Sequence, residues 1–65
     1  MKKKKIDFKI LFAESERVKA INKIAYYKKA IKNGYDKNEG EYNIRESENA
    51  LIIWDWIIES LNELK

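Results

Sequence analysis

The sequence predicts an all-α fold, a two-helix hairpin with a short N-terminal extension that is completed by homodimerisation. Two stretches repeat apolar residues at the three- and four-residue spacing of one helix face, and both glycines of the 65-residue chain lie between them. A chain of this length buries only about 60% of the surface that its unfolded form exposes. It has no cysteine for a disulfide, so we expect a second copy or another partner to supply further burial.

Residues 15–33 are predicted to form the first helix. Lysines crowd its end, where they suit the negative end of the helix dipole. Asn33-Gly34 supplies a stop, because glycine adopts the left-handed conformation at low cost. The apolar stripe of this segment consists of Ala13, Ala20, Ile24, Tyr27 and Ile31, with Ile21 beside it.

Residues 34–42 are predicted to be a loop, and residues 43–65 a second helix. Asn43 and Glu46 have the spacing of a capping box. Residues 51–54 are rich in strand formers, but no Gly or Pro bounds them, so the length of the segment favours a helix. One face of this helix carries Ala50, Leu51, Trp54, Ile57, Ile58 and Leu61.

Residues 1–12 are predicted to be a basic N-terminal arm whose structure stays open. Ile6, Phe8, Ile10 and Phe12 alternate with other residues at close to the period of a half-buried strand. As a helix, the same residues scatter around the axis. A lone strand would have to pair across a dimer or with the sheet of another protein.

The most informative functional feature is an apolar patch on the second helix. Ile52 and Trp56 are predicted to lie opposite the face that packs, and Ile53 extends the patch around one flank. A helix with a single neighbour is normally polar on its back, and an exposed Trp–Ile patch is typical of a contact surface. Three interpretations remain open: the N-terminal segment folds back so that Phe8 and Phe12 cover Trp56, or the patch is a homodimer seam, or it binds a different protein.

Charge is divided unevenly along the chain. Residues 1–35 carry a net charge of +8 and residues 36–65 a net charge of −5. Such a division favours antiparallel docking of the two helices, within one chain or between chains, although individual surface ion pairs are weak. The plain alternative is that both are solvated faces that keep a small protein in solution.

The basic arm also permits an interaction with nucleic acid. Its candidate contacts are Lys3, Lys4, Lys5 and Lys9, which could bind phosphates. If residues 6–12 are a strand, the order strand, helix, helix is also the layout of ribbon-helix-helix repressors, in which a two-stranded ribbon lies in the major groove. No residue-level signature of that family is present.

Catalysis, metal binding and cofactor binding have little support. The chain lacks His and Cys and has no glycine-rich phosphate loop. The acidic segment 36–41 fails as a calcium loop, because Gly40 occupies a ligand position. The longest apolar run, residues 51–58, is far short of the roughly 20 residues that span a bilayer, so we expect a cytoplasmic protein. A third class, binding to a membrane surface, stays open because the N-terminal segment combines lysines with apolar residues.

The sequence therefore predicts a non-enzymatic protein that acts by stoichiometric protein–protein binding, of the regulator or inhibitor type, through Ile52, Ile53 and Trp56. The abundance of Lys, Ile, Asn and Tyr, whose codons are AT-rich, suggests a low-GC bacterium or one of its phages or plasmids as the source. The alternative function is a dimeric DNA-binding repressor that uses the N-terminal segment.

Overall fold

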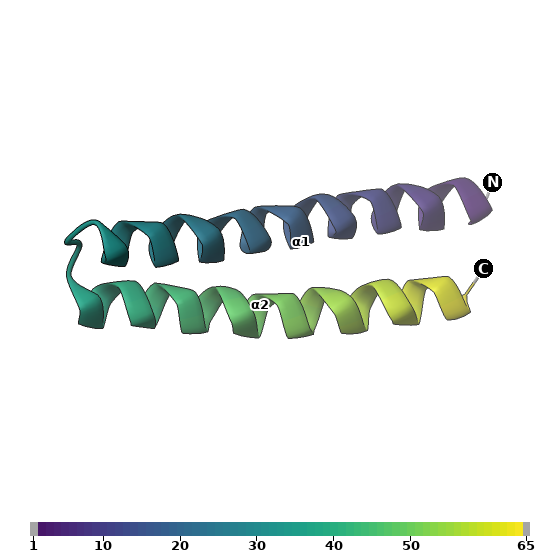
Figure 1. Ribbon diagram of the computed structural model, residues 1–65. Helices are drawn as coiled ribbons and strands as arrows, with labels where there is room; N and C mark the ends of the chain where they lie inside the picture. Colours follow the sequence, from purple (N-terminus) through teal and green to yellow (C-terminus); the bar gives the residue numbers. More distant parts are fainter. Residues whose placement is uncertain (1, 65) are drawn as a thin grey trace.

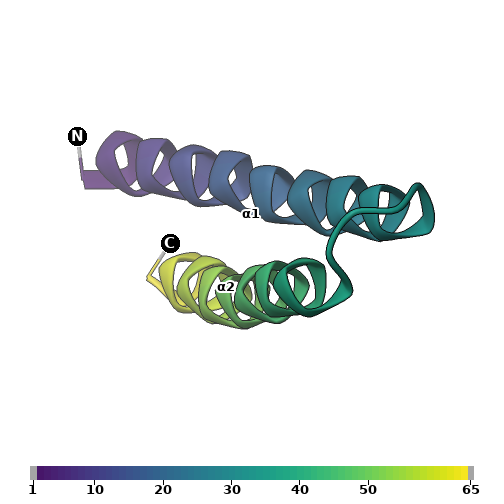
Figure 2. The ribbon, with the colours of Figure 1, turned by 90° about the vertical axis from the view of Figure 1, so that its left-hand side faces the viewer.

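The computed structural model describes residues 2–64, and the side chains of residues 5–64. It contains two helices, α1 (Lys2–Lys32) and α2 (Lys37–Glu63), which lie side by side and antiparallel (Figures 1 and 2). The Cα atoms extend over 50 × 14 × 10 Å. The predicted helical hairpin is confirmed, and no strand occurs within residues 2–64.

The N-terminal segment is the first departure from the sequence prediction. Residues 6–12 are helical, and α1 starts at Lys2 and not near residue 15, so no separate arm of residues 1–12 exists in the described part of the chain. The physical reason is that Ile6 and Ile10 extend the stripe of Ala13 backwards at helical spacing, and both side chains turn towards α2. Extending an existing helix costs far less than starting a new element.

The link between the helices begins with the stop that the sequence predicts. Gly34 has a φ of 102°, in the left-handed region. Its backbone N–H donates to the carbonyl of Ile31 at 3.1 Å, and that of Tyr35 donates to the carbonyl of Ala30 at 2.9 Å. These two bonds form a Schellman motif, which satisfies carbonyls that the end of α1 would otherwise leave unpaired.

The second helix begins earlier than predicted. The carboxylate of Asp36 accepts from the backbone N–H of Glu39 at 3.0 Å and caps α2. Asn43, the expected cap, lies inside the helix and donates from Nδ2 to the carbonyl of Glu39 at 2.9 Å. The predicted loop of residues 34–42 is therefore wrong in extent, because only residues 33–36 link the helices.

Most of the residues that are buried between the helices are small. The buried residues are Ile10, Ala13, Ala20, Gly40 and Ser47, and Ala13 is only 1% exposed. No large side chain among the described residues is fully buried. Half-buried side chains flank these residues at alternating spacings of three and four, as in a two-stranded coiled coil: Ile6, Ile24, Tyr27, Ile31, Ile44, Leu51, Trp54, Ile58 and Leu61.

Two contacts between the helices fix their register. Arg17 Nε forms an ion pair with Asp55 Oδ1. The ring of Phe12 meets the indole of Trp54 edge-on, with centroids 6.0 Å apart. Consequently the N-terminal half of α1 lies beside the C-terminal half of α2, at the open end of the hairpin (Figure 1). Neither described helix is long and apolar enough to cross a bilayer.

Candidate functional site

The patch that the sequence indicates lies on α2 and points away from α1. Trp56 and Ile52 are each 68% exposed, and Ile53 is 55% exposed. Because Trp54 and Ile58 on the same helix face α1, the four-residue step from Ile52 to Trp56 follows the far side of α2. We call Ile52 and Trp56 the outer strip. Their role as contact residues stays a prediction.

The N-terminal segment does not cover the outer strip. Phe12 packs against Trp54 and not against Trp56, and Phe8 is itself 74% exposed. The interpretation in which Phe8 and Phe12 shelter Trp56 is therefore wrong for this fold. The reason is geometric, because α1 runs along the opposite side of α2 from Trp56.

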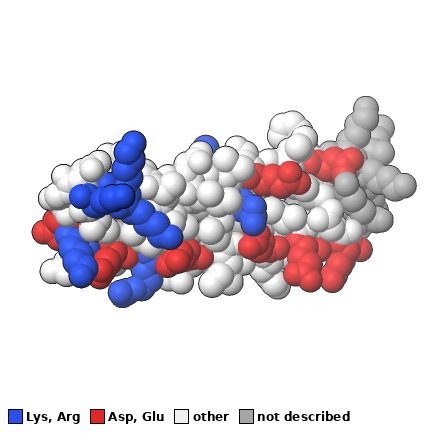
Figure 3. Space-filling model, viewed as in Figure 1, with Lys and Arg blue, Asp and Glu red and all other residues white. Residues whose placement is uncertain are grey.

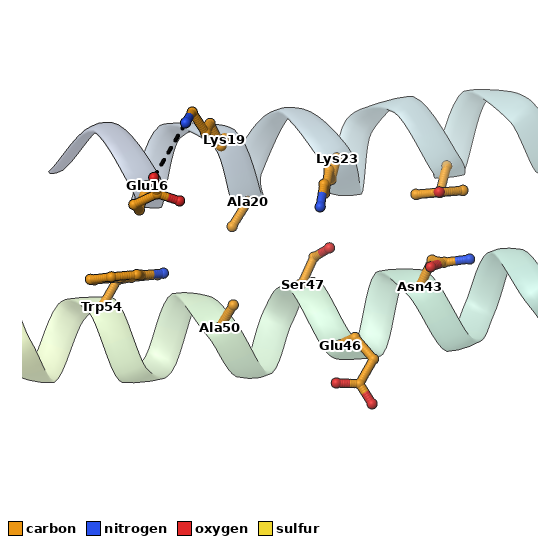
Figure 4. A pocket seen from close by; sticks show the side chains of 10 residues that line it. Glu16, Lys19, Ala20, Lys23, Asn43, Glu46, Ser47, Ala50 and Trp54 are labelled. Carbon is orange, nitrogen blue, oxygen red and sulfur yellow. Dashed lines mark hydrogen bonds and ion pairs between the residues drawn. The ribbon is translucent and has the colours of Figure 1, made fainter. Parts of the chain in front are cut away.

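A shallow groove of about 250 Å³ runs between the helices on one face (Figure 4). Its small side chains, Ala20, Ser47 and Ala50, let the helices approach closely, and Trp54 closes one end. On the α1 wall, Lys19 Nζ pairs with Glu16 Oε1 at 3.2 Å. The wall side chains carry both signs of charge and lie open to solvent, unlike the convergent polar groups of a typical enclosed ligand pocket.

The groove continues into an apolar surface towards the open end. At helical spacing, Phe12 follows Glu16 on the α1 wall, while Ile53, Ile57 and Leu64 follow Ala50 on the α2 wall. All of these apolar side chains except the half-buried Ile57 are exposed. Phe8 lies midway around the helix between Ile6 and Ile10 and so points away from α2. We call the whole surface the groove face: Phe12, Glu16, Lys19, Lys23, Glu46, Ala50, Ile53, Ile57 and Leu64.

The opposite face of the hairpin is different in character. In both Figures 1 and 4, α1 lies above α2. In Figure 1 the N-terminus of α1 is on the right, so α1 runs from right to left. In Figure 4 Glu16 lies to the left of Lys23, so α1 runs from left to right. The two figures therefore view opposite faces. Figure 3, which has the view of Figure 1, shows Lys, Arg, Asp and Glu side chains spread along this second face. By helical spacing this second face also carries the exposed Leu11, Val18 and Ile21 of α1, whereas α2 presents Glu48, Asp55 and Glu59 there. The groove face differs at its open end because both helices contribute apolar side chains to it.

The candidate nucleic-acid contacts are only partly described. Lys5 and Lys9 are exposed on α1. The side chains of Lys3 and Lys4 lie outside the described residues. Because the segment is helical, these lysines follow a helix and do not alternate along a strand, so the described chain offers no ribbon for the major groove.

One titratable group at the closed end has a shifted pKa. The hydroxyl of Tyr35 donates to Glu39 Oε2 at 3.1 Å. That hydrogen bond, a small desolvation and the nearby carboxylate charge raise the pKa of Tyr35 above its ordinary value of 10.0. The pair tethers the link to the first turn of α2.

No cluster of three or more metal-ligating side chains occurs in the described part of the chain. We place the candidate site on the surface, because the side chains of the outer strip are exposed.

Sequence reasoning does not identify the groove face, because Phe12 is predicted to lie in the arm and Leu64 has no predicted role. No pattern within a single helix indicates this surface. Comparison with protein-family models, curated proteins and solved structures finds no match to this chain.

Proposed function

We propose that this protein has no catalytic activity and works by stoichiometric binding to another protein, in the manner of a regulator or inhibitor, through the outer strip. The observation that carries the proposal is the exposure of Trp56 and Ile52 on the side of α2 that faces away from the rest of the chain. Trp is among the residues most enriched at binding hot spots. Leaving an indole and a four-carbon side chain together in water is costly unless a partner covers them.

The shape of the hairpin supports a surface function. The chain has a largely half-buried seam and a shallow, open groove. A rod with apolar groups on its outside suits occupation of a site on a larger protein. In that complex, Ile53 lies at the border between the outer strip and the groove face.

The ribbon-helix-helix alternative is not carried forward, because it needs an N-terminal strand and residues 2–12 are helical. If the protein binds duplex DNA with an affinity that falls steeply between 50 and 200 mM salt, a role in binding nucleic acid would be supported again.

The test is a quantitative pull-down with nuclease-treated lysate, comparing the wild-type chain with Trp56→Lys and Ile52→Lys. We expect a protein that binds the wild type in stoichiometric amount to be lost from both variants. Asn62→Lys is the matched control, because it adds the same charge at an exposed position of α2 that lies away from the outer strip. Equal recovery of that protein by Trp56→Lys and the wild type would overturn the proposal.

A further inference from the structure

We propose that a second copy of this chain packs on the groove face to form a four-helix bundle. The two-fold axis of this bundle runs along the length of the hairpin, so the two copies lie side by side with their open ends at the same end. The inference does not rest on the proposed function, because the outer strip and the groove face point in different directions from α2. It begins from a surplus of exposed surface.

The hairpin exposes more surface than a compact protein of its mass. Its accessible surface is 5487 Å², whereas a folded monomer of 7.8 kDa is expected to expose about 4,400 Å². The radius of gyration is 14.9 Å, against about 11 Å for a compact domain of this length. The excess, roughly 1,100 Å², is comparable to the ~800 Å² that each partner buries in a standard interface.

The groove face is the surface that a second copy would cover. Phe12, Ile53 and Leu64 are exposed there, and Ile57 lies half-buried among them. These side chains come from both helices and flank one groove, as the inner faces of a helix bundle do. On the opposite face, α1 exposes Leu11 and Val18, but α2 presents the carboxylates of Glu48, Asp55 and Glu59. Charged groups follow that face along its length (Figure 3), so the two faces are not equivalent docking sites.

Charge complementarity selects another copy of the chain as the occupant. Helix α1 carries eleven basic and three acidic side chains, a net charge of +8, while α2 carries two basic and seven acidic ones, a net charge of −5. A two-fold axis along the hairpin places α1 of each copy over α2 of the other, antiparallel to it. Every pair of neighbouring helices then joins a basic helix to an acidic one.

The same axis matches the apolar groups. It brings the open ends together, so that Phe12 of one copy lies at the level of Ile57 of the second copy. Towards the closed end, Lys23 of one copy lies at the level of Glu46 of the other. A two-fold axis across the hairpin would instead stack α1 on α1, with like charges together, and would set the apolar end of each copy on the charged end of its neighbour.

The first test measures mass by sedimentation equilibrium over a range of concentrations. We expect the wild type to reach twice 7.8 kDa. Phe12→Glu places a carboxylate against the acidic helix of the second copy, and Ile53→Lys places an ammonium against the basic one, so both should return the mass to that of one chain. Val18→Glu is the matched control, because Val18 is an exposed apolar residue of α1 on the other face.

A second test does not depend on disrupting the assembly. The chain has no cysteine, so single-cysteine variants can be mixed and oxidised. Phe12→Cys should form a mixed disulfide with Ile57→Cys, and Val18→Cys should not.

Three outcomes would overturn the proposal: a wild-type mass of one chain at millimolar concentration, a dimer that survives Phe12→Glu and Ile53→Lys but not Trp56→Lys, or no preference of Phe12→Cys for Ile57→Cys. The proposed function has a separate outcome, because Trp56→Lys should abolish capture of the other protein and leave the dimer mass unchanged.

Discussion

The two glycines of the chain serve different physical needs. Gly34 adopts a positive φ with no atom near the place where a Cβ would be, so the backbone conformation alone requires glycine there. Gly40 is helical and buried, and a Cβ there would overlap Cγ1 and Cδ1 of Ile31. Contact with α1 therefore explains a residue that helix propensity disfavours in the first turns of α2.

Gly40→Ala should destabilise the hairpin. Overpacking typically costs about 1–3 kcal/mol, and alanine recovers up to about 1 kcal/mol of helix propensity, so we expect a net loss of about 1 kcal/mol. Denaturant unfolding followed by circular dichroism measures it. In the double variant with Ile31→Ala, the overlap is removed, and the cost of Gly40→Ala should vanish or change sign. Additive effects of the two substitutions would show that the close approach does not matter.

The Tyr35–Glu39 hydrogen bond should make the closed end sensitive to alkali. Because the pKa of Tyr35 is raised in the folded chain, its stabilising contribution is fully present below pH 10 and is lost as the pH rises through the folded value. An NMR titration of the Tyr35 ring should show Glu39→Gln lowering this pKa towards 10. Glu41→Gln, which alters a carboxylate outside the pair, should leave it unchanged.

At the scale of the elements, the ends of the helices are set by short-range signals that the sequence contains more than once. Asp36 and Glu39 have the same spacing as Asn43 and Glu46. The structure uses the first pair, because Gly34 ends α1 and a cap two residues later lets α2 return directly along it. The spacing alone does not distinguish the two, so the sequence predicts the existence of α2 and misplaces its start.

Asp36→Ala should therefore destabilise the chain by about 1 kcal/mol, the usual cost of losing an N-cap side chain. Asp36→Asn should retain most of the stability, since its side-chain oxygen also accepts from the N–H of Glu39. Thermal unfolding of these two variants and of Asn43→Ala shows which residue acts as the N-cap of α2. A larger loss from Asn43→Ala than from Asp36→Ala would contradict the observed start of α2.

The N-terminal segment shows why a local pattern can mislead. The alternation from Ile6 to Phe12 fits a strand, and the expectation that a helix would scatter these residues around its axis is correct. Ile6 and Ile10 turn towards α2, while Phe8 and Phe12 are exposed. The strand interpretation fails because α2 offers a surface to pack against, and no sheet in the described chain offers a strand a partner.

For the whole molecule, sequence reasoning identifies the outer strip but not the groove face. The outer strip can be predicted because Ile52 and Trp56 are apolar but lie on the opposite side of α2 from the apolar stripe that packs against α1. The groove face is made by residues of both helices, and which of them lie at the same level follows from the register that Arg17 and Asp55 set across the hairpin. No periodicity within one helix contains that information.

Assembly should appear in thermal unfolding. If folding and dimerisation are coupled, the Tm rises with chain concentration by mass action. For a dimer of two 65-residue chains, the usual unfolding enthalpy per residue gives a rise of about 5 °C for each tenfold increase in concentration. Scanning calorimetry from 10 µM to 1 mM measures this, and a Tm independent of concentration would contradict coupled assembly.

The unequal sharing of charge between the helices has a consequence in acid. Below about pH 3 most carboxylates are protonated, and the net charge of the chain rises from +3 towards +14. Helix α2 then no longer attracts α1, because both are cationic, with charges approaching +2 and +11. The folded rod becomes a polycation with little interior to resist mutual repulsion. Small-angle scattering at pH 2 and low salt should show an expanded chain, and added chloride should compact it again.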